Sequence, residues 1–172
     1  MTKKNGFSLL ELLIVLVVLG VITSIAFPRY TFHKARMHFE AAVDGSKAVF
    51  DLAKGYSTAL NRVVRVSINK DTQNKLMDLS VIDVNPPDSS TGNVLEQLIL
   101  RDPWVITISP STVEYIDYYP HESVKLLNAG KSLVSDSENC SIGFVMEYSS
   151  RTLSANVVIY SQSGSSKLYK NY

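Results

Sequence analysis

The sequence lacks most of the features that mark an enzyme, a disulfide-stabilised scaffold or a nucleic-acid-binding protein. Its 172 residues include a single cysteine, Cys140, so no disulfide can form within the chain. Seventeen basic and 16 acidic side chains leave a net charge of +1, which provides no basic field suited to nucleic acid. No G-x-S-x-G motif, P-loop or cysteine–histidine pair supplies a nucleophile or a phosphate-binding loop. We therefore expect neither an enzyme nor a nucleic-acid partner.

Metal ligands are equally sparse. His33 and His38 are five residues apart, which places them about 140° apart around a helix and on different faces. His121 lies in an expected loop. The polar stretch 135–139 could offer oxygens to calcium, but it lacks EF-hand spacing and we interpret it as a solvated loop. We expect no metal and no cofactor.

Hydrophobic residues are concentrated near the N-terminus. An apolar run extends from Leu12 to Phe27 and is closed by Pro28. Counted from Phe7 to Ala26, the stretch has 20 residues, which as a helix of about 30 Å matches the hydrocarbon core of a bilayer. A secretory signal would have an apolar region of roughly 7–15 residues, followed by an A-x-A-like cleavage site. Here the apolar region is longer than that, and no such cleavage site follows it. We expect a retained, membrane-spanning helix.

Charged residues at the start of this helix give it a direction and a candidate functional residue. Lys3 and Lys4 place the N-terminal side in the cytoplasm by the positive-inside bias, so the rest of the chain would lie outside. Glu11 is the one carboxylate in the apolar segment. A charge at the bilayer centre costs roughly 2.5–3.5 kcal/mol on insertion scales, and even nearer an end it indicates a function.

The stretch Gly6-Phe7-Ser8-Leu9-Leu10-Glu11, after a short basic leader and before the apolar helix, resembles the class III signal of type IV pilins and pseudopilins. In that family a prepilin peptidase cuts after the glycine and methylates the new N-terminal residue. The resemblance implies a cut between Gly6 and Phe7 and N-methylation of Phe7. Glu11 and Pro28 then fall where the family carries its glutamate and where many members carry a proline.

Cleavage would give Glu11 a partner. It creates a positive α-amine at Phe7, four residues before Glu11 on the same helix face. In the low-dielectric core of a filament the carboxylate can pair with such an amine on a neighbouring subunit. An unpaired buried charge would cost several kcal/mol, so this pairing favours the correct subunit register. The alternative is that Glu11 reaches the lipid headgroups of a plain membrane anchor.

Residues 29–61 contain no proline and carry an apolar stripe with a period of 3.5, which predicts an amphipathic helix. The stripe consists of Ala35, Phe39, Ala42, Ser46, Val49, Ala53, Tyr56 and Leu60. It is narrow and rich in alanine, as expected of a helix that lies on a sheet. Pro28 would kink or weaken the join between the two halves of one long helix.

The remainder of the chain predicts strands and turns. Alternation indicates short strands around 64–68 and 79–83, before a loop at 85–92 and a helical turn over 94–100. Further strands are expected at 104–108, 112–118, 142–148 and 155–161, with a flexible connection at 164–166. The predicted fold class is α+β and pilin-like: a long N-terminal helix, membrane-spanning in its first half and packed by its second half on an antiparallel sheet.

The head carries a second, weaker resemblance. Residues 41–50, followed by Cys140 at the start of a tyrosine-containing strand, look similar to mannose-sensitive haemagglutinin-type pilins. Many pilins close this region with a disulfide, but Cys140 has no partner, and residues 161–166 carry serines where a second cysteine would be expected. We predict Cys140 to be a small buried hydrophobe, with intermolecular pairing as the alternative. At least half of five tyrosines are expected in the core, and the others could form an adhesive patch: Tyr115, Tyr118, Tyr119, Tyr148 and Tyr160.

The resemblance implies a major or minor subunit of a bacterial type IV pilus that serves adhesion, surface attachment or motility. Its segments would be a leader of residues 1–6, a membrane and filament-core helix of residues 7–27, and a head of residues 28–172. Its partners would be membrane lipid, the prepilin peptidase and N-methyltransferase, an inner-membrane assembly platform and other pilin subunits. Before assembly the head would lie in the periplasm. The alternatives are a type II secretion pseudopilin, a DNA-uptake pilin and a membrane-anchored periplasmic enzyme.

Overall fold

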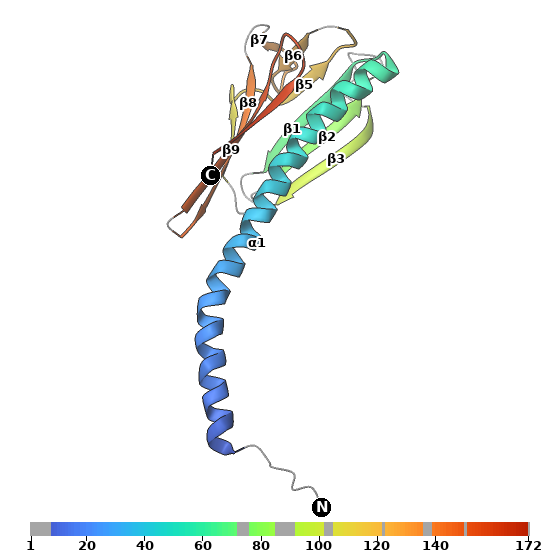
Figure 1. Cartoon of the computed structure of the whole chain (residues 1–172). Helices are drawn as coiled ribbons and strands as arrows, with labels where there is room; N and C mark the ends of the chain where they lie inside the picture. Colours follow the sequence, from blue (N-terminus) through green and yellow to red (C-terminus); the bar gives the residue numbers. More distant parts are fainter. Residues whose placement is uncertain are drawn as a thin grey trace, which may run out of the picture. The chain divides into compact units, whose positions relative to one another are not determined.

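The computed structural model describes residues 8–71, 76–84, 92–101, 105–121, 123–135, 139–149 and 151–171. In these residues one long helix precedes ten strands, which form two antiparallel sheets (Figure 1). The chain divides into two compact units, one that ends at His38 and one that begins at Phe39. The second unit is called the head below.

Helix α1 runs without interruption from Leu9 to Leu60. Its first turn begins at Ser8, whose carbonyl accepts hydrogen bonds from the backbone amides of Glu11 and Leu12 at 3.0 and 3.2 Å. Pro28 lies inside the helix and does not end it, although proline removes one backbone donor there. By length and composition α1 could cross a membrane.

The head half of α1 buries one face, as the sequence predicts. Five stripe residues from Phe39 to Ala53 are buried, and the face is widened by Val43, Phe50 and Ser57. The predicted stripe is wrong at its C-terminal end, because Tyr56 is half-buried and Leu60 is 42% exposed. A 3.5-residue repeat drifts around a straight helix of 3.6 residues per turn, so Ser57 takes the inward position instead.

The larger sheet has six strands in the order β3-β2-β1-β5-β6-β7. Their bounds are β1 Val64–Asp71, β2 Leu76–Asp83, β3 Asn93–Arg101, β5 Tyr115–Tyr118, β6 Val124–Leu127 and β7 Leu133–Ser135. Val66 and Ile68 of β1 are buried opposite Val81 and Leu79 of β2, as the alternation predicts. The helix passes close to β3, since Leu98 lies 3.4 Å from the position that a Cβ at Gly45 would take.

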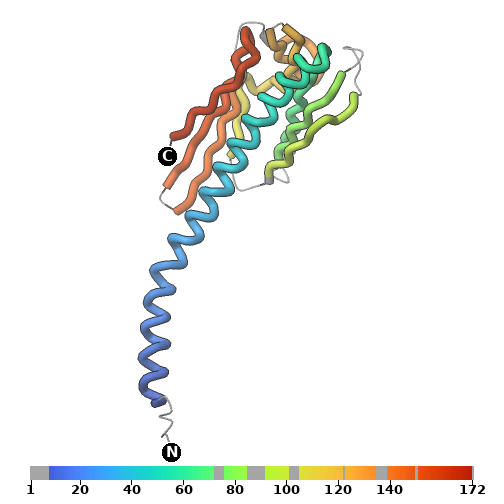
Figure 2. The backbone as a smooth tube through the Cα atoms, turned by 45° about the vertical axis from the view of Figure 1, so that its right-hand side comes forward, coloured from blue at the N-terminus to red at the C-terminus, as the bar shows by residue number. Residues whose placement is uncertain are grey.

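The smaller sheet has four strands in the order β10-β9-β8-β4. Their bounds are β4 Val105–Ser109, β8 Cys140–Tyr148, β9 Arg151–Ile159 and β10 Ser166–Asn171. Figure 2 shows the two sheets on either side of the head half of α1. Polar contacts tie α1 to β10: Lys170 bridges Asp44 at 2.9 Å, and the Ser166 hydroxyl donates to Asp51 at 2.5 Å.

Two local predictions are wrong. Residues 94–100 form strand β3 instead of a helical turn, because pairing with β2 supplies the backbone partners that so short a helix could not. The strands predicted at 104–108 and 112–118 are present and lie in different sheets: β4 joins β8 in one, and β5 joins β1 and β6 in the other. The expected flexible connection ends in strand β10, paired with β9. The loop at 85–92 lies outside the described residues except for Gly92.

Candidate functional site

The predicted processing site, Gly6 and Phe7, lies outside the described residues, as do Lys3 and Lys4. Glu11 is described and lies in the first turn of α1. Ser8 directly precedes the helix, so Ser8 and Glu11 have the S-x-x-E spacing of a capping box. A carboxylate in the first turn also interacts favourably with the helix dipole. The sequence therefore already contained a local role for Glu11 that the bilayer argument alone misses.

The helix from Leu9 to Phe27 buries none of its large apolar side chains in the head or elsewhere in the chain. They are 47% to 83% exposed on every side of the helix. A helix that is apolar all round needs lipid or other helices as neighbours. Its two hydroxyls bond within the helix, Thr23 to the carbonyl of Leu19 and Ser24 to that of Val21, both at 2.8 Å. Apart from the Glu11 carboxylate, the side chains of this segment are thus suited to a medium of low dielectric constant.

Pro28 sits at the end of this apolar segment. Its missing N–H leaves the carbonyl of Ser24 without its usual helical donor. One turn later, the Thr31 hydroxyl donates to the carbonyl of Pro28 at 3.0 Å. The helix therefore continues through a point with one backbone hydrogen bond fewer.

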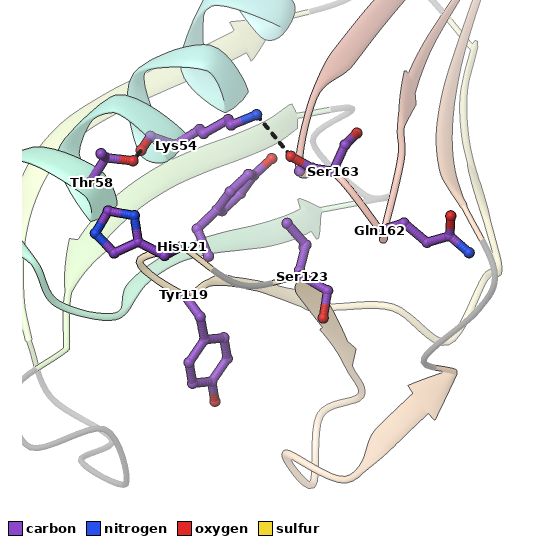
Figure 3. A pocket seen from close by; sticks show the side chains of 10 residues that line it. Lys54, Thr58, Tyr119, His121, Ser123, Gln162 and Ser163 are labelled. Carbon is purple, nitrogen blue, oxygen red and sulfur yellow. Dashed lines mark hydrogen bonds between the residues drawn. The ribbon is translucent and has the colours of Figure 1, made fainter.

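A polar cavity of about 390 Å³ lies in the head beside the last turns of α1 (Figure 3). Three regions distant in sequence form it: α1, the end of β5 with the start of β6 and described residues between them, and the turn before β10. Its lining residues are Lys54, Thr58, Tyr118, Tyr119, His121, Ser123, Val124, Gln162, Ser163 and Gly164. The Lys54 ammonium donates to the Ser163 carbonyl at 2.7 Å and so links α1 to the turn.

Two residues of the cavity wall have left-handed backbones. Gly164 has a φ of 62°, and a Cβ there would lie 2.8 Å from Cγ2 of Val124, so this turn requires glycine. His121 has a φ of 63°, which is uncommon for a residue with a side chain. The His121 side chain is exposed, as are His33 and His38. Among the described residues no three His, Cys, Asp or Glu side chains gather as a metal site would require.

A buried ion pair lies in the larger sheet. Arg65 and Asp117 are opposite each other on β1 and β5, and the guanidinium donates two hydrogen bonds to the carboxylate at 2.6 and 2.7 Å. The hydrogen bond to Asp117 raises the pKa of Arg65. Tyr115 lies over the guanidinium at 5.4 Å, and the Lys125 ammonium lies 4.4 Å from the ring centre of Tyr119.

Cys140 is fully buried and free, which confirms the prediction of a small buried hydrophobe. Burial raises the pKa of its thiol to about 12. The prediction for the tyrosines is wrong, because only Tyr118 of the five is buried. Burial also raises the pKa of Tyr118, whose hydroxyl has no hydrogen-bond partner among the described residues.

Comparisons with known proteins agree with the N-terminal pattern and the fold. Residues 1–27 match the model of the prokaryotic N-terminal methylation motif. Two fimbrial proteins of Pseudomonas aeruginosa are each 33% identical over 73 residues, which are 42% of this chain and 47% of theirs. The chain therefore spans about half the length of these curated relatives. A crystal structure of the Pseudomonas aeruginosa type IV minor pilin FimU aligns with a TM-score of 0.52 over 80% of this chain and 92% of FimU, at 13% identity. This likeness confirms the α+β, pilin-like fold class.

Proposed function

We propose that this chain is a structural subunit of a bacterial type IV pilus, because its first 27 residues match the prokaryotic N-terminal methylation motif and the relatives it resembles are fimbrial proteins. The observation that carries the proposal is the surface of α1 from Leu9 to Phe27, which is apolar and exposed on every side. Such a helix is stable in a bilayer and is equally stable when similar helices surround it. One segment can therefore serve first as a membrane anchor and then as the core of a filament.

Processing at the N-terminus prepares the chain for this change of surroundings. Residues 1–6 form the leader, residues 7–27 the spanning and core helix, and residues 28–172 the head. Cleavage between Gly6 and Phe7 removes both leader lysines and leaves 15 basic and 16 acidic side chains. A near-neutral subunit packs beside its copies without strong self-repulsion.

Glu11 sets the register of assembly. In the filament core its carboxylate pairs with the methylated α-amine of Phe7 on a neighbouring subunit, which relieves the cost of a buried charge. Pro28 marks the end of the core segment, where the missing hydrogen bond to Ser24 lets the helix adjust as it leaves the membrane. The role is structural and needs no catalytic group in the head.

The partners follow from this sequence of events. They are anionic or neutral membrane lipid, the prepilin peptidase and N-methyltransferase, the inner-membrane assembly platform, and other pilin subunits. Before assembly the subunit crosses the inner membrane once with its head in the periplasm. Afterwards it lies in a surface pilus that serves adhesion, attachment or motility. A pseudopilin role is less favoured, because the sequence relatives are fimbrial proteins.

Mass spectrometry of the mature N-terminus tests the processing step. The expected species begins at N-methylated Phe7. An intact Met1, or a cut at any other bond, would overturn this part of the proposal.

Substitution of Glu11 tests the assembly step. Glu11→Val should insert in the membrane and be processed normally but give few filaments, because the register contact is lost. Thr23→Val is the matched control, since it replaces a polar group by an apolar one in the same helix without removing a charge. Normal filament yield from Glu11→Val, or an equal loss from Thr23→Val, would contradict the role of Glu11.

A further inference from the structure

We propose that the polar cavity in the head binds a carboxylated sugar of the uronic acid class, with the Lys54 ammonium facing the carboxylate and the His121 imidazole facing the sugar hydroxyls. The cavity volume of about 390 Å³ lies within the range of small-ligand sites, roughly 300–1,000 Å³. This site goes beyond subunit assembly, because every residue that forms it belongs to the head.

The charge of the lining selects an anion. Lys54 and His121 are the ionisable nitrogen groups of the wall, and none of the lining residues that the structure describes is an aspartate or a glutamate. Lys54 carries three donor hydrogens, and its described partner, the Ser163 carbonyl, takes one of them. The ammonium is therefore held in position with donors left for a ligand.

The neutral groups of the lining select a hydroxylated ligand. Thr58, Ser123 and Ser163 contribute hydroxyls, and Gln162 contributes an amide. Hydroxyls and amides both donate and accept, as the hydroxyls of a sugar do. In Figure 3, Lys54 and Thr58 come from α1. The Lys54 ammonium points to Ser163, and the His121 ring lies on the side of Thr58. A small carboxylate without hydroxyl groups would leave most of these side chains hydrogen-bonded to water only.

The backbone around the cavity is built at some cost in strain. His121 holds a left-handed conformation, and such strain in a residue with a side chain clusters at ligand sites. At Gly164 the turn approaches Val124 so closely that a side chain does not fit. This close approach fixes the Ser163 carbonyl, and through it the Lys54 ammonium. The fold thus places the Lys54 ammonium through its bond to Ser163, and the His121 imidazole through its backbone.

Binding of small probes to the full processed chain in detergent micelles tests the proposal. Isothermal titration calorimetry would compare glucuronate with glucose, which lacks the carboxylate, and with acetate, which lacks the sugar. We expect glucuronate to bind in the millimolar range, and glucose and acetate each to bind at least about tenfold more weakly, as the loss of charge-assisted or neutral hydrogen bonds predicts. Equal binding of glucose would overturn the anionic class, and equal binding of acetate would overturn the sugar.

Two variants and one control locate the site. Lys54→Met removes the ammonium and keeps most of the side-chain stem. His121→Asn removes the imidazole but suits a left-handed backbone, so it leaves the loop in place. Each should weaken glucuronate binding about tenfold. Lys47→Met is the control on the same helix, because Lys47 pairs with Asp51 and does not line the cavity, and it should bind as the unchanged chain does.

Thermal unfolding of each variant confirms that the head is folded. Unchanged glucuronate binding by a folded Lys54→Met chain would refute the proposal. A second pair of results would also refute it: the unchanged chain binds no glucuronate, and Lys54→Met assembles fewer filaments. The occupant of the cavity would then be a neighbouring subunit. Micelle-held monomers need not polymerise, so failure of sugar binding leaves the pilus role standing, and failure of assembly leaves the binding site standing.

Discussion

Removal of one partner from the Arg65–Asp117 ion pair should strongly destabilise the head. The side chains of Arg65 and Asp117 are only 6% and 3% exposed, and both guanidinium–carboxylate hydrogen bonds are short. Asp117→Asn or Arg65→Met would leave the other charge buried without its counterion. Such a change costs about 3–5 kcal/mol. For a head of this size the midpoint of thermal unfolding should fall by roughly 10–20 °C.

Replacement of both partners should cost far less. In Arg65→Met with Asp117→Leu no charge is left buried, and well-packed apolar pairs often equal or exceed the stability of the ion pairs they replace. The double variant should therefore unfold within about 1 kcal/mol of the native chain, or at higher stability. This result would show that the large single-variant effect comes from the stranded charge and that the pair itself contributes little.

Urea unfolding of the full chain in micelles, followed by far-ultraviolet circular dichroism, measures these free energies. Lys170→Met is the control, because it breaks the exposed bridge to Asp44, and such bridges are worth about 0–1 kcal/mol. Single variants at Arg65 or Asp117 that cost no more than this control would refute the reasoning. A double variant that lost the sum of both single effects would refute it as well, since the two changes would then act independently.

Three further predictions concern single buried positions of the head. Tyr118→Phe should raise the free energy of unfolding by up to about 1–3 kcal/mol, because it removes a buried hydroxyl that no described residue satisfies, and a loss on urea unfolding would mean that the hydroxyl has a partner. Gly164→Ala should lower the free energy of unfolding by about 1–3 kcal/mol, through its positive φ and the clash with Val124, and an unchanged urea midpoint would contradict that strain. The Cys140 thiol, whose pKa burial raises from 9.0 to about 12, should resist iodoacetamide at pH 8 until the head unfolds. Its contribution to stability is fully present below pH 9 and should decline as the pH rises towards 12, so a steeper fall in the native chain than in Cys140→Ala would confirm the sign, and equal falls would contradict it.

The elements with a strong local period could be predicted from the sequence. An apolar stripe with a helical period predicts the head half of α1, and alternation of apolar and polar residues predicts β1, β2 and β8. The helical turn predicted for residues 94–100 is wrong because their aliphatic run fits a helix or a strand equally well. Only the pairing with β2 makes it a strand. The predicted burial of at least half of the five tyrosines is wrong, because alternation shows that a strand has two faces but not which face other elements cover. Tyr118 is buried by contacts, including Gly164, from far along the chain.

The two candidate sites also differ in how far the sequence alone predicts them. The N-terminal motif is contiguous, so Glu11 and Pro28 could be found from spacing alone. The cavity joins Lys54 to Ser163, which are 109 positions apart, through ordinary surface residue types. No local pattern marks such residues, because their proximity exists only after both sheets and α1 have come together.

The order of strands in the two sheets also has a consequence for folding. β1, β2 and β3 form one local meander, and β8, β9 and β10 form another. Of the strands between these meanders, β4 pairs with the later one: β4 ends at Ser109, yet its partner β8 begins only at Cys140. Pairings between distant segments close late, because the loop entropy must be overcome first. As the head emerges from its N-terminal side, the larger sheet can begin to form while β4 still has an open edge. That edge stays exposed to other chains until some thirty more residues have followed, a delay set by topology and not by the strength of any contact.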